Sequence, residues 1–191
     1  MIGLRGGNQT ATMQREIVLP ERKPALEWIL GRAVQKVSPK RRHSLLQGWW
    51  NTRLTEWARL RGEVGPEWRF RIAPPGEEIR PLVPDVAYLS YERMGDATED
   101  ELEAPLMAPN VAVEILSPTD RREFIDHKIG VYLATGCDAV IVVDPGARTV
   151  TTHEHDGRRT FADGDTFAVS ALPGFGFALT EMFEVLRLRR P

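Results

Sequence analysis

Four charged residues stand in segments whose other residues are mostly apolar. Glu114 lies inside residues 111–116, VAVEIL, which have the composition of a buried strand. Lys128 lies at the edge of the apolar stripe of the helix expected next, while Glu27 and Asp85 stand in the segments ALEWIL and PLVPDVAYL. Burying a carboxylate or an ammonium is costly unless the group is paired or binds an ion. These four residues are therefore candidates for a functional site.

The residue types indicate which chemistry such a site would perform. Carboxylates that converge on one point repel each other unless a cation lies among them. Mg²⁺ takes oxygen ligands and keeps several waters, so one Asp, one Glu and a backbone carbonyl are enough to hold it. A nearby lysine can activate or orient water for in-line attack on phosphorus. The set predicts a metal-assisted phosphodiesterase, with a purely structural Lys128–Glu114 ion pair as the alternative.

Length and composition set the class of protein. The chain has 191 residues, 42% hydrophobic and 27% charged, which is typical of one globular domain. We expect residues 1–15 to be a disordered leader and residues 16–191 to be a single domain. Cys137 is the only cysteine, which excludes a disulfide framework and a thiolate metal cluster. No apolar run approaches the roughly 20 residues of a membrane helix, so we expect a cytoplasmic protein without a membrane partner.

Charge is unevenly distributed along the chain. Residues 1–80 contain 15 Lys and Arg against 8 Asp and Glu (+7), and the remainder contains 10 against 19 (−9), which together give the net charge of −2. A basic half can face a polyanion and an acidic half can gather carboxylates for a cation, but ordinary solvated surfaces explain the distribution equally well. The candidates for contacts to a phosphate backbone are Lys40, Arg41, Arg42, Arg69 and Arg71.

Periodicity predicts the elements that carry the candidate residues before position 90. A hairpin is expected over 25–37, with Glu27 in its first strand, and a helix over 40–60. The helix has an apolar face, and its tryptophans are interpreted as core residues rather than as a platform for stacking bases. Residues 67–73 and 81–89 are expected to form a second hairpin, with Asp85 in the middle of its second strand. The apolar face of the helix consists of Leu46, Trp49, Trp50, Leu54, Trp57 and Leu60.

The acidic stretch 92–103 is expected to be an exposed loop. After Glu114, Ser117 is expected to cap a helix, with Asp120 as the capping-box acid. Residues 139–143 then form a strand parallel to that of Glu114, because strand, helix and strand follow one another.

Residues 150–154 and 159–161 are expected to pair around an Asp–Gly turn, and 179–188 to form a closing helix. His153 and His155 would share a strand face, as a metal pair does, but histidines beside a hairpin tip are more often exposed.

An ordered set of short motifs resembles one known family. The set resembles the Uma-two family of putative restriction endonucleases, in the PD-(D/E)XK nuclease superfamily, over residues 20–183. The motifs are Pro84–Asp85, VEILSP at Val113–Pro118, Asp126 with Lys128 and Tyr132, VVDP at Val142–Pro145, EWILGR from Glu27, Ser38–Pro39 and His43.

The resemblance implies a fold and a set of roles. The fold is α/β, a restriction-endonuclease-like mixed β-sheet flanked by α-helices, with additional β-hairpins. Asp85 and Glu114 would bind Mg²⁺, or Mn²⁺ in its place, together with the carbonyl of Ile115, and Glu27 would be an accessory acid. The superfamily usually places its lysine two residues after the second acid, which here is Leu116. Lys128, on the following helix, would take over that role.

These observations lead to one expected function and two alternatives. The expected function is Mg²⁺-dependent endonucleolytic hydrolysis of DNA, leaving 5′-phosphate and 3′-hydroxyl ends, with a homodimer if both strands are cut. The main alternative is a catalytically idle nuclease-fold module that binds nucleic acid or protein. A third is a metal-dependent hydrolase of a small phosphoester, for which the sequence carries no motif of its own.

Overall fold

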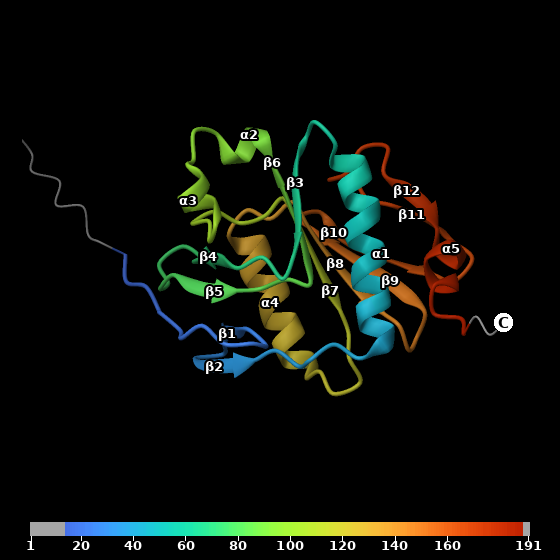
Figure 1. The fold of residues 1–191 in the computed structure, drawn as a ribbon, viewed down its shortest axis with the longest axis horizontal. Helices are drawn as coiled ribbons and strands as arrows, with labels where there is room; N and C mark the ends of the chain where they lie inside the picture. The colour runs from blue at the N-terminus through green and yellow to red at the C-terminus, as the bar shows by residue number, and fades with distance from the viewer. Residues whose placement is uncertain (1–13, 189–191) are drawn as a thin grey trace, which may run out of the picture.

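A six-stranded mixed sheet forms the centre of the protein in the computed structural model, which describes residues 14–188 (Figure 1). Its strand order is β10-β9-β8-β7-β6-β3, and every neighbouring pair is antiparallel except β7 and β8. The strands are β3 (Gly62–Pro66), β6 (Val86–Ser90), β7 (Val111–Ile115), β8 (Ala139–Asp144), β9 (Thr149–Glu154) and β10 (Gly157–Ala162). The predicted mixed sheet and the parallel pairing around the Glu114 strand are confirmed.

Two helices cover the two faces of this sheet. α1 (Arg41–Ala58) packs against one face and α4 (Arg122–Ala134) against the other (Figure 1). Alternate residues of the central strands fill the two cores, since successive side chains of a strand point to opposite faces. Val113 and Ile115 belong to the α1 core, whereas Ala112 belongs to the α4 core. By the same alternation Glu114 points toward α4.

The tryptophans of α1 are core residues, as predicted. Trp50 is fully buried, with its ring centroid 5.5 Å from that of Phe167 and 5.4 Å from that of Phe177. These phenylalanines lie on β11 (Thr166–Ala168) and β12 (Gly176–Ala178), a small sheet that was not predicted. Leu60 was wrongly assigned to the apolar face: the helix ends at Ala58, and Leu60 is 90% exposed.

Two small hairpins lie on the α4 side of the sheet. The predicted first hairpin is present as β1 (Leu26–Ile29) and β2 (Arg32–Gln35). The predicted second hairpin, of residues 67–73 and 81–89, is wrong in part. β4 (Phe70–Ile72) pairs with β5 (Arg80–Leu82), and the pairing does not extend to the rest of the predicted second strand.

The predicted second strand of this hairpin is interrupted at Val83–Asp85, and the chain continues as β6 in the main sheet. β6 pairs there with the unpredicted β3 and with β7. Pro84 lacks the N–H that a continuous central strand needs, which explains the break. Asp85 therefore precedes a strand instead of lying inside one.

Several helix boundaries also differ from the prediction. α4 begins at Arg122, and the bond from the Ser117 N–H to Asp120 Oδ2 (2.7 Å) closes a turn before the helix instead of capping it. The acidic stretch expected to be a loop contains α2 (Tyr91–Met94) and α3 (Glu99–Leu102), the latter with a Thr98–Glu101 capping box. Local capping bonds form helical turns there without any apolar periodicity.

The last elements are shorter or shifted. The closing helix α5 spans only Leu179–Glu184. The β9–β10 hairpin turns at His155–Asp156, so Gly157 already pairs with Glu154.

The N-terminal segment is described from Gln14 onward. Gln14 Nε2 donates to the Glu77 carbonyl (2.7 Å), and the carbonyl of Arg15 accepts from the Ile79 N–H (2.9 Å). The rest of the predicted leader, residues 1–13, lies outside the described residues. Within residues 14–188, none of the helices is long and apolar enough to cross a membrane.

The buried aromatic cluster gives a stability prediction. Trp50→Ala removes a fully buried side chain that α1 packs against three phenylalanines, so it is expected to lower the free energy of unfolding by about 3–5 kcal/mol. Urea denaturation measures the change. Leu60→Ala, at an exposed position just after the end of α1, is the control and should leave the unfolding midpoint nearly unchanged. Equal effects of the two substitutions would contradict the packing of Trp50.

Candidate functional site

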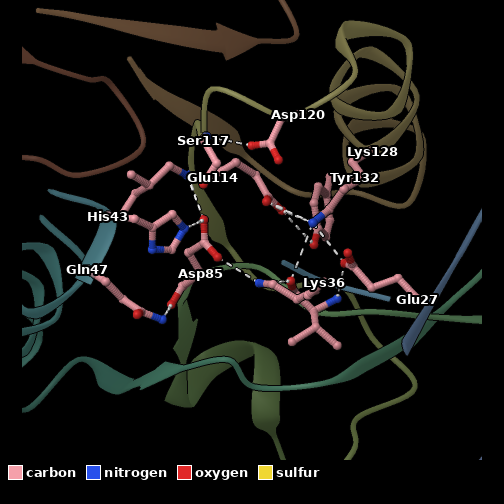
Figure 2. Close-up of polar contacts among 12 residues, drawn as sticks. Glu27, Lys36, His43, Gln47, Asp85, Glu114, Ser117, Asp120, Lys128 and Tyr132 are labelled. Atoms are coloured by element: carbon pink, nitrogen blue, oxygen red, sulfur yellow. Dashed lines mark hydrogen bonds and ion pairs between the residues drawn. The ribbon is translucent and has the colours of Figure 1, made fainter. Parts of the chain in front are cut away.

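The four candidate residues line one cavity of about 160 Å³, between the sheet, α4 and the β1–β2 hairpin. Figure 2 shows Glu27, Asp85, Glu114 and Lys128 converging there. Each of them is at most 4% exposed. The structure therefore brings together all four side chains singled out in the sequence.

Asp85 is held by three groups from different parts of the chain. Its Oδ1 lies 2.7 Å from Lys36 Nζ, and its Oδ2 lies 3.1 Å from His43 Nε2 and accepts from the Ile115 N–H at 2.7 Å (Figure 2). Burial acts to raise the pKa of Asp85, but the Lys36 ammonium and His43 outweigh it and hold the pKa well below its usual range. Asp85 is therefore a carboxylate at neutral pH.

Glu114 faces α4 because of its position on β7. Lys128 Nζ lies 2.7 Å from Oε1 and 2.8 Å from Oε2, and the Tyr132 hydroxyl donates to Oε1 at 3.3 Å. Lys128 and Tyr132 are one turn apart on α4, so both reach the same carboxylate. Burial raises the pKa of Glu114 to about 7, and the positive charge of Lys128 limits the rise.

Lys128 is shared between two carboxylates. Besides Glu114 it contacts Glu27 Oε1 at 2.8 Å. Burial acts to lower the pKa of Lys128, but the charges of Glu114 and Glu27 outweigh it and raise the pKa above its ordinary value. The side chain is therefore a permanently charged donor.

The β1–β2 hairpin contributes one charge of each sign. Glu27 accepts from the Val83 N–H at 2.8 Å, and Lys36 donates to the Val83 carbonyl at 2.9 Å. Both backbone groups lie in the break between β5 and β6, where a regular ladder is missing. The side chains of Glu27 and Lys36 thus provide hydrogen-bond partners for the backbone N–H and carbonyl at the break and fix the position of Asp85.

Lys36 is the main residue that the sequence reasoning missed. The strand register pairs Glu27 with Val34, and the Lys36 N–H donates to the Ala25 carbonyl at 2.9 Å. Cross-strand partners share a face, so Lys36 lies on the face of Glu27. The hairpin turn at Leu30–Gly31 was the available signal. Counting cross-strand pairs outward from this turn would have placed Lys36 on the same face of the hairpin as Glu27.

Two side chains of α1 complete the surroundings of Asp85. His43 contacts the carboxylate, and Gln47, one turn later, donates to the Asp85 carbonyl at 3.0 Å (Figure 2). His43 Nδ1 is buried and has no hydrogen-bond partner among the described residues. His43 had been noted only as part of a motif, and no pattern in the sequence pointed to Gln47.

The donor set fits a hard divalent cation such as Mg²⁺. Three carboxyl groups face two ammonium groups in the cavity, which gives a local charge of −1 when all three carboxyl groups are ionised and His43 is neutral. Asp85 and Glu114 offer the oxygen ligands that Mg²⁺ prefers, and the Ile115 carbonyl points to the same strand edge as its N–H, which contacts Asp85. Within residues 14–188, no three His, Cys, Asp or Glu side chains form a metal site by themselves. Such an ion would therefore need the backbone carbonyl and waters.

The predicted basic contacts fall into two groups. Arg71 pairs with Glu16 at 3.1 Å and donates to the Ala104 carbonyl, and Arg69 lies 3.8 Å from Glu21, so nearby acids already occupy both. A second pocket, of about 530 Å³, lies beside the cavity, and His43 lines both. The other three basic residues, Lys40, Arg41 and Arg42, line this second pocket.

Two further sequence interpretations concern other parts of the fold. Cys137 is buried, and burial raises the pKa of its thiol to about 12, as expected of a packing residue. His153 lies on β9, and His155 lies in the turn before β10; within the described residues, neither belongs to a group of three or more His, Cys, Asp or Glu side chains that could hold a metal ion.

Comparisons with known proteins concern the chain as a whole. Residues 14–180 match the model of the Uma2 family, described as "Putative restriction endonuclease". Among solved structures, the chain is similar to a putative nuclease belonging to DUF820 from Anabaena variabilis ATCC 29413. The TM-score is 0.78 and the identity 24%, over 88% of this chain and 95% of that one. At this identity the likeness shows the fold. No curated protein matches the chain.

The buried ion pairs give a second stability prediction. Lys128→Met would leave Glu27 and Glu114 without their shared cation, so the free energy of unfolding is expected to fall by about 3–5 kcal/mol. Adding Glu114→Gln should recover part of this loss, because one unpaired charge is removed. Urea denaturation of the single and double variants measures both changes.

Arg122→Met provides the matched control on the same helix. Arg122 is exposed and lies 3.6 Å from Asp126, so its removal should hardly change stability. A Lys128→Met variant as stable as this control would show that the buried network contributes nothing to the fold.

Proposed function

Because the chain belongs to the Uma2 family of putative restriction endonucleases, we propose that it is a metal-dependent endonuclease that hydrolyses DNA phosphodiester bonds. One observation carries the proposal. Asp85, just before β6, and Glu114, on the neighbouring strand β7, line the same cavity as a charged lysine. Two acids can hold a metal ion and a lysine can orient the water, which together would serve metal-assisted attack of water on a phosphodiester.

The acids and one carbonyl would bind the metal ion. Asp85, Glu114 and the Ile115 carbonyl would hold Mg²⁺, or Mn²⁺ in its place. The ion would neutralise the charge that develops on the phosphate oxygens during displacement. Because the hydrogen bond from the Ile115 N–H and the contact with His43 fix Oδ2 of Asp85, this ligand is oriented before the ion arrives.

Lys128 would position the attacking water. Its raised pKa keeps the side chain protonated, so it acts as a donor to the water oxygen and does not accept the proton. Glu27 would act through Lys128, since it holds the ammonium at 2.8 Å on the side away from Glu114. This arrangement would replace the lysine usually found two residues after the second acid, where this chain has Leu116.

The substrate would contact the protein through its phosphates. Lys40, Arg41 and Arg42 lie in the pocket next to His43, at the start of α1, where backbone phosphates beside the scissile bond could bind. Water attack in line with the 3′-oxygen would leave 5′-phosphate and 3′-hydroxyl ends. Cutting both strands in a single binding event would use two copies of the site and would suggest a homodimer.

A catalytically idle binding module is the second candidate, and one observation favours it. Asp85 is already paired with Lys36, and Glu114 with Lys128, so the cavity can be held together by its own ion pairs. In that case the protein would keep the fold and bind nucleic acid or protein without metal. Mg²⁺ binding separates the two candidates, because an idle module has no need for it.

Removing either proposed ligand should abolish cleavage. Asp85→Asn and Glu114→Gln keep the side-chain shape but remove the charge that binds the metal, so nicking of supercoiled plasmid in Mg²⁺ should fall by at least about 100-fold. Calorimetry should show Mg²⁺ binding by the wild-type protein and its loss in both variants.

Glu56→Gln is the matched control for this experiment. Glu56 lies on the exposed side of α1 and far from the cavity lining, so cleavage and Mg²⁺ binding should match those of the wild type. Equal nicking by all four proteins would assign the activity to a contaminant or to another site. Absence of both cleavage and Mg²⁺ binding in the wild type would favour the idle module.

A further inference from the structure

We propose that Lys36 binds the scissile phosphate of the substrate, and that its ammonium must leave Asp85 before a divalent cation can bind there. The inference rests on the proposed function and assigns a role to a residue outside the set of Asp85, Glu114, Lys128 and Glu27. In the structure, which contains neither ion nor substrate, Lys36 Nζ lies 2.7 Å from Asp85 Oδ1 (Figure 2).

The position of Lys36 places it within reach of a substrate. Its side chain is 10% exposed and lines the same cavity as Lys128. Lys36 contacts Asp85 and Lys128 contacts Glu114, and both ammonium groups donate to the Val83 carbonyl, at 2.9 and 3.4 Å. A phosphate bound by an ion on Asp85 and Glu114 would therefore lie close to both ammonium groups.

Lys36 is held less firmly than Lys128. Lys128 lies within α4 and contacts two carboxylates, whereas Lys36 follows the end of β2 and contacts one carboxylate and the Val83 carbonyl. Its four-carbon stem is flexible, so the ammonium can turn to a new acceptor without a change in the backbone. Lys36 is therefore the cation that can move when another cation arrives.

The charge balance favours this exchange. With Lys36 on Asp85, the three carboxylates exceed the two ammonium groups by one charge. When a divalent cation takes the place of Lys36, the ion and Lys128 together balance the three carboxylates. The displaced ammonium then carries a positive charge that a phosphate can neutralise.

Two substitutions at Lys36 should change Mg²⁺ affinity in opposite directions. Lys36→Met removes the competing cation from Asp85, so Mg²⁺ should bind at least about tenfold more tightly by calorimetry. Lys36→Arg should bind Mg²⁺ several-fold more weakly than the wild type, because a guanidinium can grip a carboxylate through two hydrogen bonds. If Lys36 had a purely structural role, its replacement by Met would instead weaken Mg²⁺ binding.

Cleavage should respond differently from metal affinity. Lys36→Met should nick plasmid at least about 100-fold more slowly at saturating Mg²⁺, since the phosphate loses a donor. Lys23→Met is the matched control, because Lys23 is exposed and lies outside the cavity lining. Both its Mg²⁺ affinity and its cleavage rate should equal those of the wild type.

The outcomes separate this inference from the proposed function. A wild-type protein that binds Mg²⁺ and cleaves, with a Lys36→Met variant that binds Mg²⁺ no more tightly or cleaves equally fast, overturns the role of Lys36 alone. A wild-type protein that does neither overturns both. If Lys36→Met does not fold, Lys36→Arg decides: Mg²⁺ affinity equal to or above that of the wild type overturns the competition for Asp85.

Discussion

The burial of five charged side chains in one cavity is the constraint on which the rest of the structure depends. Glu27, Lys36, Asp85, Glu114 and Lys128 would each destabilise the fold if left unpaired. Their partners come from different elements: the hairpin pairs with the break before β6 and with α4, and α4 pairs with β7. Each element is therefore held in place partly by charges that belong to another. Moving one of them would leave a buried charge without a partner.

The alternation of the central strands explains how a hydrophobic fold accommodates these charges. Residues of β7 point in turn to the α1 core and to the α4 core. Glu114 lies on the α4 face of β7, whereas the α1 face carries the hydrophobic cluster of Trp50 and its phenylalanines. The polar cavity and the aromatic core thus lie on opposite faces of the same sheet. Chemistry on one face does not require a weaker core on the other.

The lysine that contacts Glu114 comes from a helix and not from the strand that carries Glu114. Leu116, two residues after Glu114, packs partly buried against the α4 core. Lys128 reaches the same face from the helix that covers it and contacts both oxygens of Glu114. A helix can supply the ammonium because β7 and α4 pack face to face. The hairpin adds Lys36 beside Asp85 in a similar way, from outside the main sheet.

The sequence by itself determined which residues would be brought together. Glu27, Asp85, Glu114 and Lys128 were identified as charged residues within apolar segments, because burial makes such placements costly. Periodicity identified the buried face of α1, and the order strand, helix, strand identified the parallel pair. Only the tertiary structure decided what lies around them. The unpredicted β3 and the contacts of Lys36, His43 and Gln47 with Asp85 all depend on pairing between segments distant in the sequence. Local patterns encode the face on which a side chain lies, but not which distant segment covers that face.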